Sequence, residues 1–246
     1  MVGTDHCPVS KEDMIEIIAE IGQNHNGDIG LAKELIHAAR ECGANVAKFQ
    51  LFDARELFPR EGNPWFEYNC KCELDREQTL LLAEDCARLG IEFMASVFDC
   101  GRIGWLEEAG VARYKVASRS VVDKQLIEAI AATGKPILVS LGMWQGSGFP
   151  AISAAGGVQF LYCVSKYPTA LDEVELSRVD FSRYAGFSDH TVGVSAPLAA
   201  MSRGARIIEK HFTLDKAMFG PDHEGSATPD ELKQMTAFRD DCEMLL

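Results

Sequence analysis

The sequence lacks the features that would direct it to a membrane or to a nucleic acid. Its apolar runs are strand-sized and interrupted, well short of the roughly 20 residues that a membrane-spanning helix needs. Positive charge is scarce, since 24 lysines and arginines stand against 37 aspartates and glutamates and the net charge is −13. Because nucleic acids and anionic membranes attract basic surfaces, this balance predicts neither of them as a partner.

The chain also shows no targeting motif and no cysteine motif. Its first residues, MVGTDHCPVSKEDM, contain no basic start followed by an apolar core, so a signal peptide is not expected and the predicted location is cytoplasmic. The eight cysteines are scattered, and the close pair Cys70 and Cys72 lacks the C-x-x-C spacing of redox and zinc sites. Reduced thiols are expected in that compartment.

What the sequence does contain is an alternation of two kinds of segment. Short apolar, β-branched runs predict strands, and segments with helical periodicity occur between most of them. Eight such strands in 246 residues predict an α/β fold, a single-domain (β/α)8 TIM barrel over residues 1–246, whereas a doubly wound open sheet would not require eight evenly spaced strands. The strand candidates are residues 14–22, 45–52, 92–99, 113–118, 136–142, 159–165, 184–190 and 205–212.

Several helical segments carry recognisable ends. One opens with Asp75 and closes with Gly90, which are typical N-cap and C-cap residues. Thr228 and Pro229 predict the N-cap and the first residue of the last helix. The segment MWQGSGFPAISAAGGV, after the fifth strand, is short and rich in glycine, so no regular helix is predicted there.

Polar side chains recur at the carboxyl ends of seven of the predicted strands. These ends face the active site in a (β/α)8 barrel, and an unpaired lysine or glutamate in the barrel interior would be strongly destabilising. One such residue alone is more often structural, but their convergence indicates a functional site. In chain order they are Glu20, Lys48, Gln50, Ser96, Lys115, Ser118, Ser165, Tyr167, Ser188, His190, Glu209 and His211.

Two groups within this set suggest a chemistry. His190 and His211 end adjacent predicted strands and suit a divalent transition metal bound by imidazole, and Glu20 could hold a water on that metal. Lys48 and Lys115, with the nearby hydroxyls, offer the charges and short donors that bind a phosphorylated anion.

The polar loop after the first strand, GQNHNGDIG, contains a further histidine, His25. This residue is as compatible with a ligand contact as with a role in stabilising the turn, and the residues alone leave both open. Met143, Trp144 and Trp105 are interpreted as core or as pocket wall, with no chemistry assigned.

Five stretches of the chain resemble the N-acetylneuraminate (sialic acid) synthase family, with the barrel domain only. They are IIAEIGQNHNGD, AKFQ, YKVAS, FSDHTVG and IIEKHFTLDKAMFGPDHEGSATPDELKQM, in the family's order across residues 15–240. The resemblance implies a TIM barrel that condenses phosphoenolpyruvate with an aldose, typically N-acetylmannosamine or a relative, to a nonulosonic acid, and releases phosphate by C–O cleavage. It also implies a divalent metal, most often Mn²⁺, with Mg²⁺ or Co²⁺ as alternatives.

The resemblance further implies roles for particular residues. His190 and His211 match the metal ligands, and Glu20 matches the carboxylate beside the metal, an acid/base partner of a water or of the sugar. These three are the implied catalytic residues. The positions that match phosphoenolpyruvate contacts are Lys48, Ser96, Lys115, Ser118 and Ser188. The positions that match the sugar side are Gln50, Asn63, Tyr167 and Asp222.

The chain departs from the family pattern in two places. Family members usually carry Ser-Gly-Glu after the fourth strand, whereas here Ser118 is followed by Arg119 and Ser120, so a bulky cation replaces a glycine. The antifreeze-like domain that follows the barrel in typical members is expected to be absent. Recognition of an N-acetyl group and the family's homodimer are therefore left open for this chain.

Two other functions remain open from the residues. A Schiff-base aldolase would use Lys115 or Lys48 as its nucleophile, would need no metal and would be trapped by borohydride with pyruvate. It leaves the paired histidines unexplained. A barrel that binds a ligand without turnover is the other alternative, supported by Arg119, Ser120 and the expected absence of the second domain, and a turnover assay separates it from a synthase.

Overall fold

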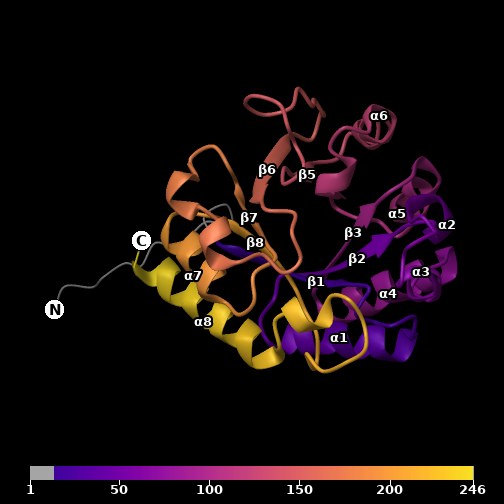
Figure 1. Ribbon diagram of the computed structural model, residues 1–246, viewed down its shortest axis with the longest axis horizontal. Helices are drawn as coiled ribbons and strands as arrows, with labels where there is room; N and C mark the ends of the chain where they lie inside the picture. The colour runs from indigo at the N-terminus through magenta and orange to yellow at the C-terminus, as the bar shows by residue number, and fades with distance from the viewer. Residues whose placement is uncertain (1–13, 246) are drawn as a thin grey trace.

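Eight parallel strands pair in chain order and close into a barrel, because β1 (Glu16–Gly22) pairs with β8 (Ile207–His211) as well as with β2 (Val46–Leu51) (Figure 1). The structure is a computed structural model that describes residues 14–245. The first 13 residues, on which the predicted absence of a signal peptide mostly rests, lie outside the described part. The predicted TIM-barrel fold is confirmed.

Each run predicted as a strand overlaps one strand of the barrel. From β2 to β8 each strand pairs with the next strand in the chain, and every neighbouring pair is parallel. In addition to β1, β2 and β8, the strands are β3 (Glu92–Val97), β4 (Tyr114–Val116), β5 (Ile137–Ser140), β6 (Val158–Cys163) and β7 (Gly186–Asp189).

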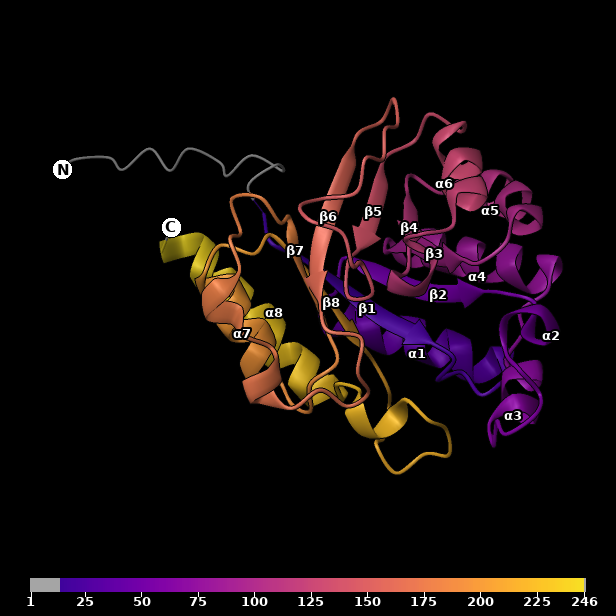
Figure 2. The same ribbon diagram turned by 45° about the horizontal axis from the view of Figure 1, so that its top comes forward.

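Helices surround most of the barrel and leave one side thinly covered (Figures 1 and 2). Within residues 14–245 no helix joins β5 to β6, where residues 142–157 hold five glycines and a proline. Between β6 and β7 the chain forms only the single turns η3 (Leu171–Glu173) and η4 (Leu176–Arg178). The helices are α1 (Ile29–Glu41), α2 (Ala54–Leu57), α3 (Phe66–Lys71), α4 (Arg76–Leu89), α5 (Ile103–Glu108), α6 (Lys124–Ala131), α7 (Ser195–Ser202) and α8 (Pro229–Leu245). The missing helix after β5 agrees with the glycine-rich segment in which no regular helix is predicted, whereas the predicted strand–helix alternation is wrong for the connection between β6 and β7.

The helix ends that the sequence predicts are confirmed. The Asp75 side chain accepts a hydrogen bond from the Gln78 backbone N–H, and Gly90 ends α4 in the left-handed conformation with φ 68°. At the start of α8, the Thr228 backbone N–H donates to Glu231 at 2.9 Å, and the Glu231 backbone N–H donates back to Thr228 Oγ1 at 3.4 Å. These reciprocal contacts satisfy N–H groups that a helix start leaves unpaired.

Two further findings concern the described cysteines and helices. The seven cysteines within residues 14–245 are all free thiols. In that same part of the chain, no helix combines the length and the apolarity that crossing a bilayer requires.

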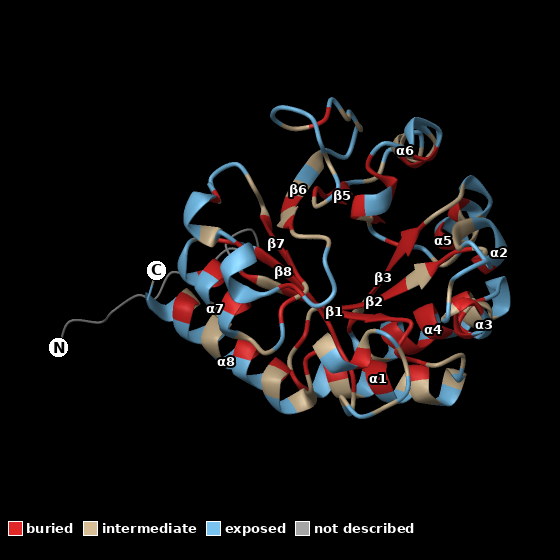
Figure 3. Ribbon diagram, in the orientation of Figure 1, coloured by how far each residue is buried: buried red, intermediate tan, exposed pale blue. Residues whose placement is uncertain are grey.

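The barrel interior changes from apolar to polar along its strands, which are mostly buried except for β6 (Figure 3). Near the amino ends, six side chains form a small buried cluster: Ile18, Val46, Met94, Leu138, Leu161 and Ile207. Side chains two positions apart on a strand share a face, so the residues two positions further on also point inward. Those residues are Glu20, Lys48, Ser96, Ser140, Cys163 and Glu209. An apolar floor therefore lies beneath a polar layer at the carboxyl ends of the strands.

Candidate active site

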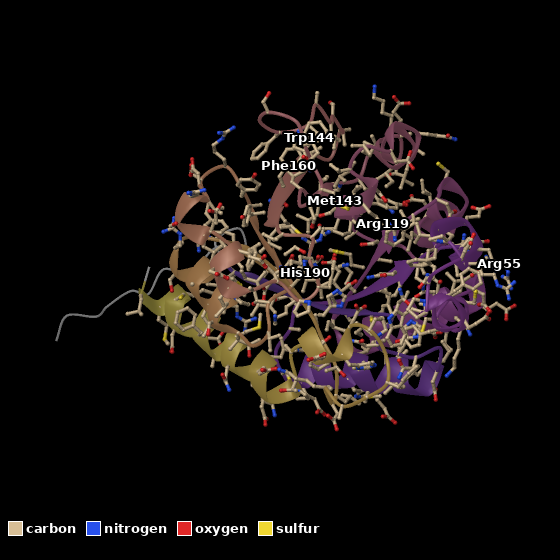
Figure 4. All side chains as sticks on the ribbon, viewed as in Figure 1. Arg55, Arg119, Met143, Trp144, Phe160 and His190 are labelled. Carbon is tan, nitrogen blue, oxygen red and sulfur yellow. The ribbon has the colours of Figure 1, made fainter. Side chains whose placement is uncertain are left out.

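A cavity of about 480 Å³ opens above this polar layer, at the end of the barrel where the strands terminate. Of the twelve residues to which the sequence assigns a role, eleven line it, and the structure therefore brings together side chains from seven strands and their loops. In Figure 4 the labels of His190, Met143 and Arg119 lie over this open end of the barrel. The eleven are Glu20, Lys48, Gln50, Ser96, Lys115, Ser118, Tyr167, Ser188, His190, His211 and Asp222.

Two lysines and two glutamates form a buried ionic cluster at the base of the cavity. Lys48 Nζ lies 2.5 Å from Glu20 Oε2 and 3.5 Å from Glu209 Oε2. Glu209 Oε1 lies 3.5 Å from Lys115 Nζ, so this carboxylate bridges the two ammonium groups. All four side chains are less than a tenth exposed, and each buried charge therefore has an opposite charge beside it.

Short hydroxyl side chains add hydrogen bonds to this ionic cluster. Lys48 donates to Ser96 Oγ at 3.2 Å, and Lys115 donates to Ser140 Oγ at 2.7 Å. The Ser188 hydroxyl donates to Glu209 Oε1 at 2.8 Å. Each hydroxyl can turn to serve a bound anion instead, so the cluster can exchange its internal contacts for a ligand carrying phosphate or carboxylate oxygens.

Burial and ion pairing oppose each other in the pKa values of this cluster. Burial alone would raise the pKa of Glu209, but Lys115 and Lys48 outweigh it and lower that pKa to about 2. Burial would likewise lower the pKa of Lys48, but Glu20 and Glu209 raise it above its ordinary value. For Lys115 burial prevails over the attraction of Glu209, and its pKa is lowered. The cluster therefore keeps Glu209 ionised and Lys48 protonated at neutral pH.

His190 and His211 meet above the cluster, as the sequence predicts, with ring centroids 5.9 Å apart. His190 Nδ1 lies 2.8 Å from the carbonyl oxygen of Val164, which can only accept, so Nδ1 carries a proton. Burial would lower the pKa of His190, but its contacts with Cys163 and with this carbonyl raise it. His211 Nδ1 is buried and has no hydrogen-bond partner among the described residues. Burial lowers the pKa of His211, which favours the neutral, ligating form of its imidazole.

These two imidazoles fit a divalent metal only in part. Within residues 14–245 there is no group of three or more His, Cys, Asp and Glu side chains arranged to hold a metal ion. A cation held by His190 and His211 would therefore take its other ligands from water or from substrate, as metals with open coordination positions do in catalysis. The carbonyl that fixes the His190 tautomer is the kind of outer contact that supports a metal-binding histidine.

Glu20 and Gln50 lie beside His211. Gln50 Nε2 donates to Glu20 Oε1 at 2.8 Å, and Glu20 is paired with His211 across the β1–β8 register. Gly22, which has φ 54° and follows a register shift in β1, allows this approach. A Cβ atom there would lie 3.2 Å from both Glu20 Oε1 and Gln50 Nε2 and 3.3 Å from His211 Cε1. The left-handed glycine thus keeps room for Glu20 next to the histidine pair.

Tyr167 and Asp222 line the cavity near the two histidines. The Tyr167 ring lies 4.1 Å from the His190 ring, centroid to centroid, and 59% of the residue is exposed. Asp222 lies in the loop after β8 and lines the cavity with it. A ligand above the histidines would meet an aromatic face and a carboxylate, both suited to sugar hydroxyls.

Asn63 is the one predicted site residue that the structure does not bring to the cavity. It lies in the loop between α2 and α3, where its Oδ1 accepts a hydrogen bond from the Trp65 backbone N–H at 2.9 Å. Its side chain is therefore used to shape the turn that starts α3. The prediction that Asn63 contacts the sugar has no support from this position.

Sequence reasoning also left cavity residues without a role. Glu209 was placed at a strand end with no function, and Ser140 was not noted, although it ends β5 two positions after the inward-facing Leu138. The two-residue periodicity of β5 could have identified Ser140. Cys163 Sγ, which accepts from Ser118 Oγ at 3.5 Å, could have been found by the same rule in β6.

His25 proves to be a buried turn residue, which resolves the two roles that the sequence leaves open. It is fully buried, its Nδ1 accepts a hydrogen bond from the Gly27 backbone N–H at 3.2 Å, and it does not line the cavity. Burial lowers its pKa from the usual 6.5 to about 4.

This lowered pKa predicts a pH-dependent stability. Between pH 4 and 6.5 the unfolded chain binds a proton at His25 that the folded chain does not, so the stability present above that range is lost as the pH falls through it. The loss attributable to His25 reaches about 3 kcal/mol. Asparagine can still accept a hydrogen bond from the Gly27 backbone N–H but does not titrate in this range. Between pH 7 and pH 4 the free energy of unfolding of His25→Asn is therefore expected to fall by about 3 kcal/mol less than that of the wild type. Urea denaturation at both pH values measures this, with the exposed His37→Asn as control, and parallel pH profiles would contradict it.

An ion pair also lies outside the barrel wall, directly behind the two histidines. Lys210 Nζ lies 2.6 Å from Asp189 Oδ2, and both side chains are at most 1% exposed. The same ammonium donates to the Thr191 carbonyl oxygen at 2.7 Å. Asp189 and Lys210 are partners in the β7–β8 register, and each precedes one of the histidines. The pair therefore ties together the two strand ends that carry His190 and His211.

A family profile, curated relatives and a solved structure all match this chain over most of its length. A profile of the NeuB family matches residues 35–245. The chain is 36% identical to the N,N'-diacetyllegionaminic acid synthase of Legionella pneumophila over 94% of this chain and 72% of that protein. An uncharacterised protein of Methanocaldococcus jannaschii is 37% identical over 92% of this chain and 70% of its own length. The crystal structure of N-acetylneuraminic acid (sialic acid) synthetase from Leptospira borgpetersenii superposes with a TM-score of 0.86 and 32% identity, covering 94% of this chain and 85% of that one.

Proposed function

The chain belongs to the NeuB family, and we propose that it condenses phosphoenolpyruvate with an open-chain aldose to a nonulosonic acid, releasing inorganic phosphate. One observation carries the proposal. A single cavity holds two lysines in a ring of hydroxyls, which suit a phosphorylated anion, beneath a pair of histidines that suit a metal-bound acceptor. Relatives in this family are nonulosonic acid synthases, which supports the same class of reaction.

In the proposed mechanism the lysine cluster binds phosphoenolpyruvate. Lys48 and Lys115 hold its carboxylate and phosphate, and the nearby hydroxyls replace their contacts to the lysines by contacts to the ligand. The methylene carbon of phosphoenolpyruvate bonds to the aldehyde carbon, water adds at the adjacent carbon, and phosphate leaves by cleavage of its C–O bond. The residues contribute chiefly by holding the two substrates in line and by balancing their charge.

Glu20 is the proposed acid/base group. Gln50 and Lys48 fix its two oxygens, so it can accept a proton from the attacking water or from a sugar hydroxyl at a defined place beside His211. Tyr167 and Asp222 bind the sugar. His190 and His211 would hold a divalent cation such as Mn²⁺, which when bound would supply Lewis-acid chemistry for the acceptor aldehyde.

The experiment that tests the proposal measures phosphate release from phosphoenolpyruvate with Mn²⁺ across N-acetylated and plain aldoses. We expect release that depends on one class of aldose and stops when a chelator is added. No release with any sugar, from folded and metal-loaded protein, would contradict the synthase and favour a barrel that binds without turnover. Borohydride with pyruvate is the further arm, because covalent trapping of Lys115, whose pKa is lowered, would favour the Schiff-base aldolase instead.

A further inference from the structure

Arg119 stands at the rim of the cavity, in the turn η2 (Ser118–Ser120) that follows β4. Its guanidinium lies 5.3 Å from the centroid of the Phe58 ring, and Nη2 donates to the Leu57 carbonyl oxygen at 3.4 Å. These contacts hold the side chain against the loop that follows α2. In Figure 4 Arg119 is labelled over the open end of the barrel, whereas Arg55 of α2 is labelled at the outer edge.

Arg119 is also a cation that the cavity does not neutralise. The charges of Lys48 and Lys115 are already faced by Glu20 and Glu209. In the part of the chain from residue 14 to 245, by contrast, no carboxylate lies within ion-pair distance of Arg119, whose polar contact is the Leu57 carbonyl. A ligand bearing several negative charges therefore meets balanced lysines at the base and an unbalanced guanidinium at the rim.

We propose that Arg119 forms a phosphate-binding subsite at the rim of the cavity, next to Ser118. A guanidinium presents five N–H donors in a planar fork that matches phosphate oxygens, and the contacts to Leu57 and Phe58 occupy only part of it. The inference rests on the proposed function for the identity of the ligand. Two sources provide the same chemistry: the phosphate of phosphoenolpyruvate, or a phosphate ester carried by the aldose.

The first test measures binding without turnover. Inorganic phosphate and phosphoenolpyruvate are titrated into wild type, Arg119→Gly and Arg119→Lys by calorimetry, and thermal unfolding is followed alongside. We expect Arg119→Gly to weaken phosphate binding about 10- to 100-fold, because a charge-assisted hydrogen bond is lost, and Arg119→Lys to recover part of it. Arg55→Ala, an exposed arginine outside the cavity, is the matched control and should bind as the wild type does.

The second test separates the two sources of the phosphate. KM is measured in the wild type and in Arg119→Gly for phosphoenolpyruvate, for N-acetylmannosamine and for the phosphate ester of that sugar, and the two proteins are compared. A rise confined to phosphoenolpyruvate assigns the subsite to that substrate, and a rise confined to the phosphorylated sugar assigns it to the acceptor.

Failure of the subsite and failure of the proposed reaction give different results. If Arg119→Gly binds phosphate and phosphoenolpyruvate as tightly as the wild type, with unchanged KM values, the subsite is overturned. A lower unfolding temperature with unchanged affinity would show that Arg119 only braces the loop at Phe58. If the wild type turns over no sugar but its phosphate affinity still depends on Arg119, the subsite stands and the proposed reaction fails.

Discussion

Replacing His190 or His211 by alanine is expected to reduce phosphate release by about a thousandfold or more. The two imidazoles lie with ring centroids 5.9 Å apart above the lysine cluster, and residues 14–245 hold no group of three or more His, Cys, Asp and Glu side chains that could bind a metal ion in their place. Metal-ion catalysis contributes several kcal/mol to the transition state, and about 4 kcal/mol corresponds to about a thousandfold in rate.

The decisive measurement is metal affinity, since activity alone does not separate a ligand from a folding residue. Binding of Mn²⁺ followed by electron paramagnetic resonance should fall at least tenfold in both variants. Thermal unfolding of the metal-free proteins should change far less. His37→Ala, on the exposed face of α1, provides the control with unchanged binding and rate. Wild-type affinity in either His190→Ala or His211→Ala would remove that residue from the proposed metal site.

Breaking the buried pair of Asp189 and Lys210 is expected to have the largest effect on stability. Lys210→Met leaves the Asp189 carboxylate without its cation in a place that is not exposed at all, and such an uncompensated charge costs about 3 to 5 kcal/mol. The double variant Asp189→Asn with Lys210→Met removes both charges and should recover most of that loss. Asparagine can still accept from the Thr191 backbone N–H, which Asp189 Oδ1 does at 2.9 Å.

The chain offers a matched control for this effect. Lys216 and Glu231 form an ion pair of the same 2.6 Å length, but their side chains are 28% and 21% exposed. Lys216→Met should therefore change the free energy of unfolding by at most about 1 kcal/mol. Urea denaturation of the four proteins measures the comparison. An equal loss in Lys210→Met and Lys216→Met would mean that burial of the first pair does not determine its contribution.

The position of this pair predicts a second consequence for the site. Register slips move side chains to the opposite face of a strand, and a buried ionic pair is one device that specifies register. In the wild type the Lys210 ammonium donates to both Asp189 Oδ2 and the Thr191 carbonyl oxygen, and Thr191 directly follows His190. Replacing Lys210 removes both contacts at the ends of β7 and β8. Mn²⁺ affinity in the stabilised double variant should therefore remain below that of the wild type.

Much of the site was predictable because its residues follow a local rule. Lys48 and Ser96 lie two positions after the inward-facing apolar residues Val46 and Met94, and this periodicity is visible in the sequence. Lys115 is the register partner of Ser96 in the next strand. The rule fails in loops. The resemblance assigns Asn63 to the sugar, but a loop side chain is placed by its own turn, and here the Asn63 side chain accepts a hydrogen bond from the Trp65 backbone N–H within that turn.

Other features depended on contacts that no local pattern contains. Glu209 is an ordinary strand residue until the barrel closes and places it between Lys48 and Lys115, which come from strands 94 to 161 residues away in the chain. The thin cover over β5 and β6 was visible as a glycine-rich segment, but the absence of a helix between β6 and β7 was not anticipated.

The sequence by itself determined the eight strands, their apolar and polar faces, most of the helix ends and many of the strand-end residues that reach the cavity. These follow from backbone periodicity and capping, which act over a few neighbouring residues. Only the tertiary structure decided which of those residues meet. Pairing of β1 with β8 brings Glu20 beside His211, and the bulge at Gly22 leaves room for both. Lys115 and Lys48 lower the pKa of Glu209 against the effect of its burial, and burial lowers the pKa of His25. Charge interactions and desolvation depend on distance in space, and separation along the chain does not specify that distance.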